Sequence, residues 1–74
     1  MKDINAILSS ILELSENNLK DELKMEDIAL WDSLRHMELI ANIESSLGFE
    51  LSFEEISEMT SIGKIREIVS NKNK

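Results

Sequence analysis

The sequence predicts an all-α fold, a four-helix bundle with a long loop between helices 1 and 2 and a short helix 3. The chain of 74 residues has no proline and only two glycines, so few positions interrupt a helix. Long runs of β-branched residues are also absent. Apolar residues recur every three or four positions in three segments, which is the spacing of a helix face. A chain this short forms one domain, residues 1–74, with one modest core.

The first helix is expected from about Ile4 to Ser15. Asp3 is a suitable N-cap, and the polar run Glu16-Asn17-Asn18 ends the pattern. The apolar residues that share one face are Ile4, Ile7, Leu8, Ile11 and Leu12.

Residues 16–32 are interpreted as a long ordered loop, with room for a short helical turn at residues 19–24. Such long loops are uncommon in compact domains and usually have a function. The apolar residues expected to hold the loop to the core are Leu19, Leu23, Met25, Ile28 and Leu30.

The second helix is expected from Ser33 or Leu34 to Leu47. Either Asp32 or Ser33 is its N-cap, and Gly48 suits the position after its end. The predicted inward stripe consists of Met37, Ile40, Ile43 and Leu47, widened by Leu34 and Leu39.

Two further helices follow. Ser52-Phe53-Glu54-Glu55 has the form of a capping box and opens a short helix from about Phe53 to Glu58. Thr60 or Ser61 then caps a helix over residues 61–70, before a basic tail at residues 71–74. Its buried face is formed by Ile62, Ile65, Ile68 and Val69.

The net charge of −7 makes nucleic acid an unlikely kind of partner, because an acidic surface repels phosphate backbones. It suits docking onto basic patches of other proteins. The charge is uneven: residues 1–32 and residues 33–60 each carry a net −5, whereas residues 61–74 carry +3. The C-terminal segment is therefore not part of an acidic docking face.

The composition argues against an enzyme. There are no cysteines, which excludes disulfides, thiolate nucleophiles and cysteine metal sites, so any thiol would have to come from a cofactor. His36 is the only histidine, which makes a metal site improbable, and no nucleophile–base pair is evident. No segment is apolar enough to insert into a membrane, and Met1-Lys2-Asp3 is too polar for a signal peptide, so a cytoplasmic protein is expected.

The local pattern leaves two interpretations of Ser33 open. Ser33, or Asp32 beside it, can cap the second helix and have no other role. Alternatively, Ser33 is a modification site, because a phosphodiester there would lie at a helix N-terminus, where the dipole favours negative charge. Arg35 and His36 would add favourable contacts in the first turn. Trp31 is likewise either core, as a staple before the helix, or a recognition residue.

The segment Trp31-Asp32-Ser33-Leu34, followed by Met37-Glu38-Leu39-Ile40 and Ile43-Glu44, resembles the Asp-Ser-Leu signature of acyl carrier proteins. The resemblance covers nearly the whole chain. Its length, acidity, lack of cysteine, long first loop, short third helix and isoleucine-rich last helix all look like that family. The tripeptide alone is a weak signal, but at the start of the second helix of such a chain it is a specific one.

The resemblance implies that Ser33, within the motif that Asp32 and Leu34 complete, carries 4′-phosphopantetheine from coenzyme A, attached by a phosphopantetheinyl transferase. The thiol of this arm would hold an acyl group as a thioester, so the cofactor would supply the chemistry. The protein would be a monomeric phosphoprotein carrier and not an enzyme. It would serve acyl-transferring or acyl-processing enzymes of fatty-acid, polyketide or related lipid metabolism. The acyl chain would be sheltered between helices 2 and 3, by Leu39, Ile40, Ile43, Ile56 and Met59.

The resemblance also implies docking of partner enzymes through the second helix, at Glu38 and Glu44. Trp31 and Arg35 are added to this expected docking set, although the family usually has a small and an acidic residue at their positions. These departures make the docking face less negative. They favour a stand-alone carrier of a specialised pathway, for secondary metabolites, modified sugars or surface polymers, over the general fatty-acid carrier.

A rival hypothesis from another class is an unmodified acidic helical adaptor that binds a basic partner through the second helix. The two hypotheses share the fold and differ at Ser33, which only the carrier needs for function.

Overall fold

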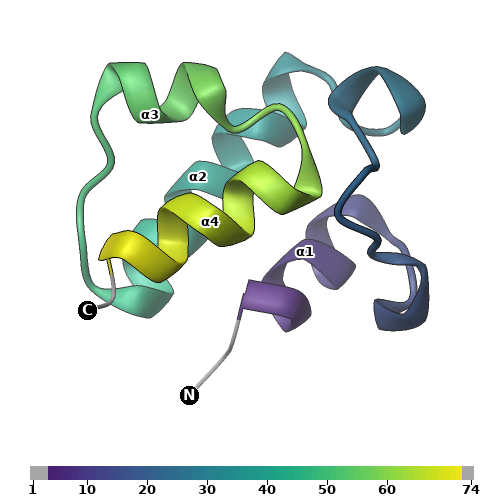
Figure 1. The fold of residues 1–74 in the computed structure, drawn as a ribbon, viewed down its shortest axis with the longest axis horizontal. Helices are drawn as coiled ribbons and strands as arrows, with labels where there is room; N and C mark the ends of the chain where they lie inside the picture. The colour runs from purple at the N-terminus through teal and green to yellow at the C-terminus, as the bar shows by residue number, and fades with distance from the viewer. Residues whose placement is uncertain (1–3, 73–74) are drawn as a thin grey trace.

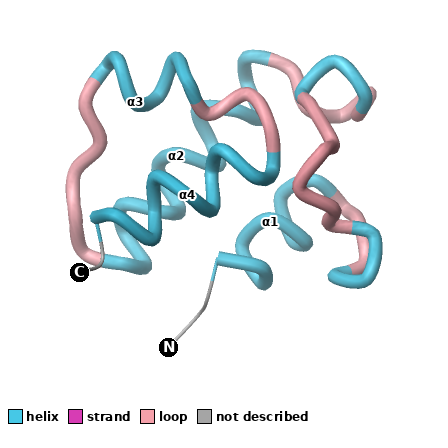
Figure 2. Tube along the Cα trace, viewed as in Figure 1, coloured by secondary structure: helices cyan, strands magenta, loops and turns pink. Residues whose placement is uncertain are grey.

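The computed structural model describes residues 4–72, which form four α-helices and two short 3-10 turns (Figure 1). The helices are α1 (Ile4–Leu12), α2 (Ser33–Leu47), α3 (Phe53–Glu58) and α4 (Ile62–Lys72). The loop between α1 and α2 contains the turns η1 (Glu16–Asn18) and η2 (Met25–Asp27), and Figure 2 shows it as a long irregular segment. The predicted all-α fold, with a long first loop and a short third helix, is confirmed.

The core is built by the three longer helices, and α3 lies over it. Each of α1, α2 and α4 contributes four buried residues, whereas α3 contributes none. The largest fully buried side chains are Leu8, Leu12, Leu39, Ile43, Met59, Ile62 and Ile65. Because α3 has no fully buried side chain, its position depends on the half-buried Ile56, which packs against the core, on its flanking residues and on a few polar contacts.

α1 ends at Leu12, three residues before the predicted end at Ser15. Glu13 adopts a left-handed conformation with φ of 56°, which turns the chain out of the helix. The Leu14 N–H then donates to the Ser9 carbonyl at 3.2 Å, and the Ser9 hydroxyl donates to the Leu14 carbonyl. The predicted N-cap, Asp3, lies outside the described residues.

The buried face of α2 confirms Leu39, Ile40 and Ile43 of the predicted inward set, and Leu47 packs against the core, but the face begins at His36 and not at Met37. It consists of His36, Leu39, Ile40 and Ile43, which keep the helical spacing. Met37 is 56% exposed and Leu34 is 76% exposed, so their predicted inward positions are wrong. The predicted set contained apolar residues only, so it did not include His36.

The loop is held to the start of α4 by backbone hydrogen bonds. Met25 N–H donates to the Thr60 carbonyl at 2.8 Å, and Ile62 N–H donates to the Leu23 carbonyl at 2.9 Å. Gly63 N–H donates to the Asp21 carbonyl at 3.0 Å, and a Cβ at Gly63 would lie only 3.0 Å from that same oxygen. Glycine at position 63 therefore permits this close approach.

The side chains of the loop follow the prediction only in part. Leu19 is buried, and Leu23, Met25 and Ile28 pack against the core, but Leu30 is 41% exposed. The helical turn predicted at residues 19–24 is absent, and the two 3-10 turns flank that segment instead.

The caps of the last three helices follow from the sequence. Asp32 caps α2, and Gly48 follows it in the left-handed conformation, with φ of 77°. The capping box of Ser52 and Glu55 opens α3. Ser61, not Thr60, caps α4, because its hydroxyl accepts from the Lys64 N–H at 3.1 Å.

α4 extends two residues beyond the predicted end, to Lys72. None of the helices within residues 4–72 has the length and hydrophobicity needed to cross a membrane.

The burial of α2 predicts unequal effects for two substitutions. Ile40→Ala is expected to lower the free energy of unfolding by about 2–5 kcal/mol, because it leaves a cavity in the core. Met37→Ala is expected to change it by about 0.5 kcal/mol or less, since Met37 is largely exposed. Urea unfolding of both variants checks this, and Ile40→Val, expected to cost about 0.5–1.5 kcal/mol, replaces Ile40→Ala if that variant does not fold. Equal losses at the two positions would contradict the assigned face.

Candidate functional site

Ser33 is the first residue of α2, and the cap of that helix is its neighbour. The Asp32 carboxylate accepts a hydrogen bond from the Arg35 N–H at 2.9 Å, which resolves the choice between Asp32 and Ser33 as N-cap. The Ser33 side chain is exposed, and no residue within 4–72 forms a hydrogen bond with its hydroxyl. Leu34 beside it is also exposed. The hydroxyl is thus open to reagents at the positive end of a helix.

Trp31 and His36 form a staple around this turn. Trp31 precedes the cap and His36 is the fourth residue of α2, which are the two positions that pack together in a hydrophobic staple. The indole Nε1–H donates to Nδ1 of His36 at 3.0 Å, and the ring centroids are 6.0 Å apart. The interpretation of Trp31 as a core staple is confirmed. With only 2% of its surface exposed, Trp31 offers almost nothing to a partner, which contradicts its expected docking role.

Arg35 connects the start of α2 to the end of α1. Its guanidinium donates to the Ile11 carbonyl at 3.1 Å and lies 3.5 Å from the Glu13 carboxylate. A cation at a helix C-terminus satisfies free carbonyls and complements the dipole. Arg35 was expected in the docking set; its partly exposed guanidinium is bound to the end of α1, so it orients α2 against α1.

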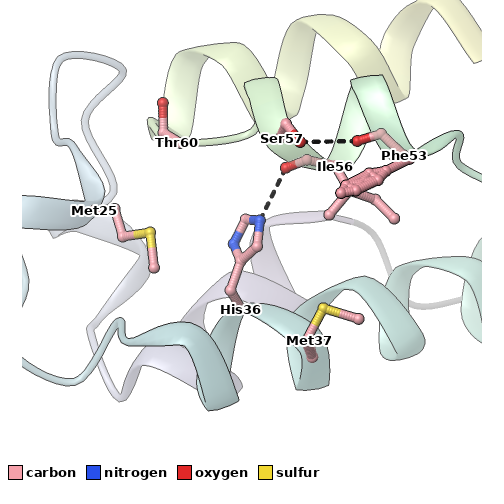
Figure 3. A pocket seen from close by; sticks show the side chains of 7 residues that line it. All are labelled: Met25, His36, Met37, Phe53, Ile56, Ser57 and Thr60. Carbon is pink, nitrogen blue, oxygen red and sulfur yellow. Dashed lines mark hydrogen bonds between the residues drawn. The ribbon is translucent and has the colours of Figure 1, made fainter.

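A pocket of about 590 Å³ lies between α2, α3 and the end of the loop (Figure 3). In this view His36 extends from α2 toward the backbone of α3, with Met25 on one side and Met37 and Phe53 on the other. Phe53 and Met37 are largely exposed and form an apolar rim. The lining residues are Met25, His36, Met37, Phe53, Ile56, Ser57 and Thr60.

This lining differs from the residues predicted to shelter an acyl chain. Of those, Ile56 lines the pocket, but Leu39, Ile40, Ile43 and Met59 are buried in the core. Sequence reasoning missed Met25, Met37, Phe53, Ser57 and Thr60 as lining residues, because the pocket is made by three segments distant in sequence. Methionine is flexible and fills irregular apolar sites, and Met25 and Met37 both line this pocket.

The capping box of α3 is extended by an ion pair to α4. Glu55 accepts from the Ser52 N–H at 2.8 Å and lies 3.0 Å from the Lys72 ammonium. The hydrogen bond from Ser52 and the charge of Lys72 hold the pKa of Glu55 below its ordinary value of 4.5. Glu55 thus joins α3, the outer wall of the pocket, to α4.

The two acidic residues expected to dock partners occupy different environments. Glu38 is exposed on α2. Glu44 is half-buried, and its carboxylate accepts from the Leu51 N–H at 2.8 Å, so it holds the segment that leads into α3. Within residues 4–72, no group of three or more histidine, cysteine or acidic side chains could hold a metal ion.

Comparison with known proteins identifies the family. The chain is 32% identical over 73 residues to the acyl carrier protein of Buchnera aphidicola subsp. Schizaphis graminum, covering 99% of this chain and 92% of that one. Its fold matches the solution structure of a holo acyl carrier protein from Geobacter metallireducens with a TM-score of 0.82 and 26% identity, covering 93% of this chain and 79% of the other. No protein-family profile matches.

The chain belongs to the acyl carrier protein family. Proteins of this family are carriers in acyl biosynthesis and not enzymes, and they carry phosphopantetheine and interact with acyl-processing enzymes.

The ion pair of α3 predicts a pH dependence of stability. Because the pKa of Glu55 is lower in the folded protein than in the unfolded chain, its ionised form adds stability above the unfolded-state pKa. This contribution is lost as the pH falls through the lowered pKa. In thermal unfolding, the melting temperature of Glu55→Gln is therefore expected to lie below that of the parent at neutral pH. This difference in melting temperature should disappear in acid. A difference in melting temperature that stays constant to low pH would refute the role of the Glu55 charge.

Proposed function

We propose that Ser33 is the attachment site of 4′-phosphopantetheine and that the protein carries an acyl group as a thioester on that arm. The observation that supports this most directly is the division of roles at the start of α2. Asp32 performs the capping, so the Ser33 hydroxyl is exposed and free of hydrogen bonds within the described chain. A capping serine would have its oxygen engaged. The thiol of the arm supplies the acyl-carrying chemistry, which this cysteine-free chain lacks.

The surroundings of Ser33 suit a phosphodiester. The first N–H groups of α2 and its dipole favour negative charge at this end. Both ends of the turn are held in place, because Trp31 is buried before it and Arg35 is bound to α1 after it. A transferase would therefore meet a preformed turn with an exposed serine.

The pocket between α2 and α3 is the proposed shelter for the acyl chain. Its rim carries Met37, one turn along α2 from Ser33, and its wall is largely apolar. We propose Met25, Met37, Phe53 and Ile56 as the contacting residues, in place of the core residues that the sequence suggested.

Partner enzymes are proposed to dock on the exposed side of α2 through Glu38, with Leu34 as an apolar contact. Trp31 and Arg35 are left out of this surface, and Glu44 has a structural role. The sparse charge on this face favours a carrier of a specialised pathway over the general fatty-acid carrier.

The alternative remains an unmodified acidic adaptor that binds a basic partner through α2. The apolar pocket beside Ser33 favours the carrier, because an adaptor that binds through an exposed helix has no use for an adjacent cavity.

Ser33→Ala is expected to abolish modification and leave the fold intact. Incubation with coenzyme A and a broad-specificity phosphopantetheinyl transferase should add one phosphopantetheine to the parent, as measured by intact mass. The variant should gain none, and its stability should change by about 0.5 kcal/mol or less, since Asp32 keeps the cap.

Ser52→Ala is the matched control for Ser33→Ala. It removes a true capping serine and should cost about 1 kcal/mol, yet it should still be modified. A folded parent that gains no mass would favour the adaptor.

Glu38→Lys is expected to weaken binding of an acyl-processing partner several-fold, and added salt should reduce the difference, because exposed charges act through screened attraction. Glu16→Lys, in η1, makes the same charge change away from α2 and should have a smaller effect. Surface plasmon resonance at two salt concentrations measures both. Equal losses in the two variants would show that net charge, and not the α2 surface, governs docking.

A further inference from the structure

His36 links the turn before Ser33 to α3 through both of its ring nitrogens. Nδ1 accepts from the Trp31 indole N–H at 3.0 Å, and Nε2 lies 3.0 Å from the Ile56 carbonyl oxygen. His36 is only 9% exposed, although it is a polar residue. We refer to this arrangement as the Trp31–His36–Ile56 bridge. Figure 3 shows its second half, which crosses the pocket from α2 to α3.

The chemistry of the two partners fixes the state of the imidazole. An indole nitrogen is only a donor and a carbonyl oxygen is only an acceptor. Nδ1 must therefore be unprotonated, and Nε2 must carry the proton that it donates to Ile56. The neutral Nε2–H tautomer satisfies both partners, whereas the other tautomer satisfies neither.

The bridge holds an element that has few other attachments. α3 is six residues long and has no buried side chain, and its remaining links are the half-buried Ile56, the Glu55–Lys72 pair and its flanking residues. Ile56 lies in its last turn, where carbonyls lack partners within the helix. The Ile56 carbonyl accepts from the Met59 N–H at 3.2 Å, and the imidazole N–H is a second donor to the same oxygen, from outside the helix.

We infer that His36 is a positioning residue that holds α3 over the pocket, and that Trp31 enforces the tautomer required for this. The bridge thereby controls the entry of an apolar group into the pocket. Met25, Met37 and Phe53 lie around the imidazole, so α3 must move relative to His36 for the pocket to widen. The inference rests on the proposed function only in identifying the apolar group as the carried acyl chain.

Three variants test the bridge in the unmodified protein. His36→Phe keeps a ring but removes both hydrogen bonds. Trp31→Phe removes the donor that fixes the tautomer and keeps an aromatic ring in the core, although a smaller one. His36→Gln supplies an acceptor and a donor on one side chain. Ser10→Ala is the control, because Ser10 is exposed on α1 and belongs neither to the bridge nor to the pocket lining.

Amide hydrogen exchange of α3 is the first measurement. His36→Phe should accelerate exchange in α3 about tenfold relative to the amides of α1 and α4, which is roughly the factor that one lost hydrogen bond is worth. Trp31→Phe should accelerate it less, His36→Gln should largely restore it, and Ser10→Ala should leave it unchanged. In the His36→Phe background, Trp31→Phe should add nothing, because its effect passes through the imidazole.

The imidazole nitrogens provide a signature that a purely structural role would not give. Long-range proton–nitrogen spectra should show a single Nε2–H tautomer in the parent and a mixture in Trp31→Phe. The inference would be overturned if the parent were in the Nδ1–H form. It would also be overturned if exchange were accelerated uniformly over all helices, or if the effects of the two substitutions on exchange were additive. If His36→Phe does not fold, Trp31→Phe and His36→Gln carry the same comparison.

Entry into the pocket is measured with Nile red, a neutral apolar dye that the negative charge of the protein does not repel. His36→Phe should bind it several-fold more tightly than the parent or Ser10→Ala. Unchanged binding would overturn the control of entry. These readouts need no modification at Ser33, so their failure is distinguishable from failure of the proposed attachment site, which the mass measurement decides.

Discussion

The burial of Trp31 is the constraint on which the functional end of this molecule depends. The side chain lies one residue before the cap of α2, it is buried in the core, and its indole N–H donates to His36 in the first turns of the helix. Arg35 fixes the same turn from the other side by binding the end of α1. The serine itself needs no contact to stay in place. An exposed group on a rigid turn is a suitable target for an enzyme that must reach it, because the turn is already ordered before binding.

A core of modest size explains why polar contacts carry so much of the architecture. A domain of 74 residues buries a smaller fraction of its surface than a larger one, and three helices supply most of the buried apolar side chains within the described residues. The loop is then held by backbone hydrogen bonds to α4, and α3 by a histidine, a glutamate and its flanking residues. The pocket is bounded by α3, the helix that contributes no fully buried side chain to the core. A cavity that must admit a guest is best bounded by an element that can move without unfolding the core.

Local patterns predicted the helices well, and tertiary contacts account for the errors. Asp32, Gly48 and Ser52 act through neighbours a few residues away, so their caps could be predicted from the sequence. The face of α2 was misassigned because His36 becomes a buried residue only when Trp31 and Ile56 satisfy its nitrogens. The position of Ser33 in the fold followed from the motif, but the pocket lining did not, because Met25, Met37 and Phe53 meet only in the folded chain. The engagement of Arg35 with Ile11 depends on the angle between two helices, which no local spacing encodes.

The hydrogen bonds between the loop and α4 have a consequence for the time at which the serine becomes usable. The backbone hydrogen-bond partners of Leu23, Met25 and Asp21 are Ile62, Thr60 and Gly63, respectively, which come about half the chain later in the sequence. The segment that leads into the Ser33 turn therefore cannot reach its final position until residues 60–63 have been synthesised and have left the ribosome. A modifying enzyme that requires the ordered turn would ignore nascent chains and act only on a nearly completed domain. Because of the backbone contacts of this loop, the cofactor would be attached only after the domain has folded completely.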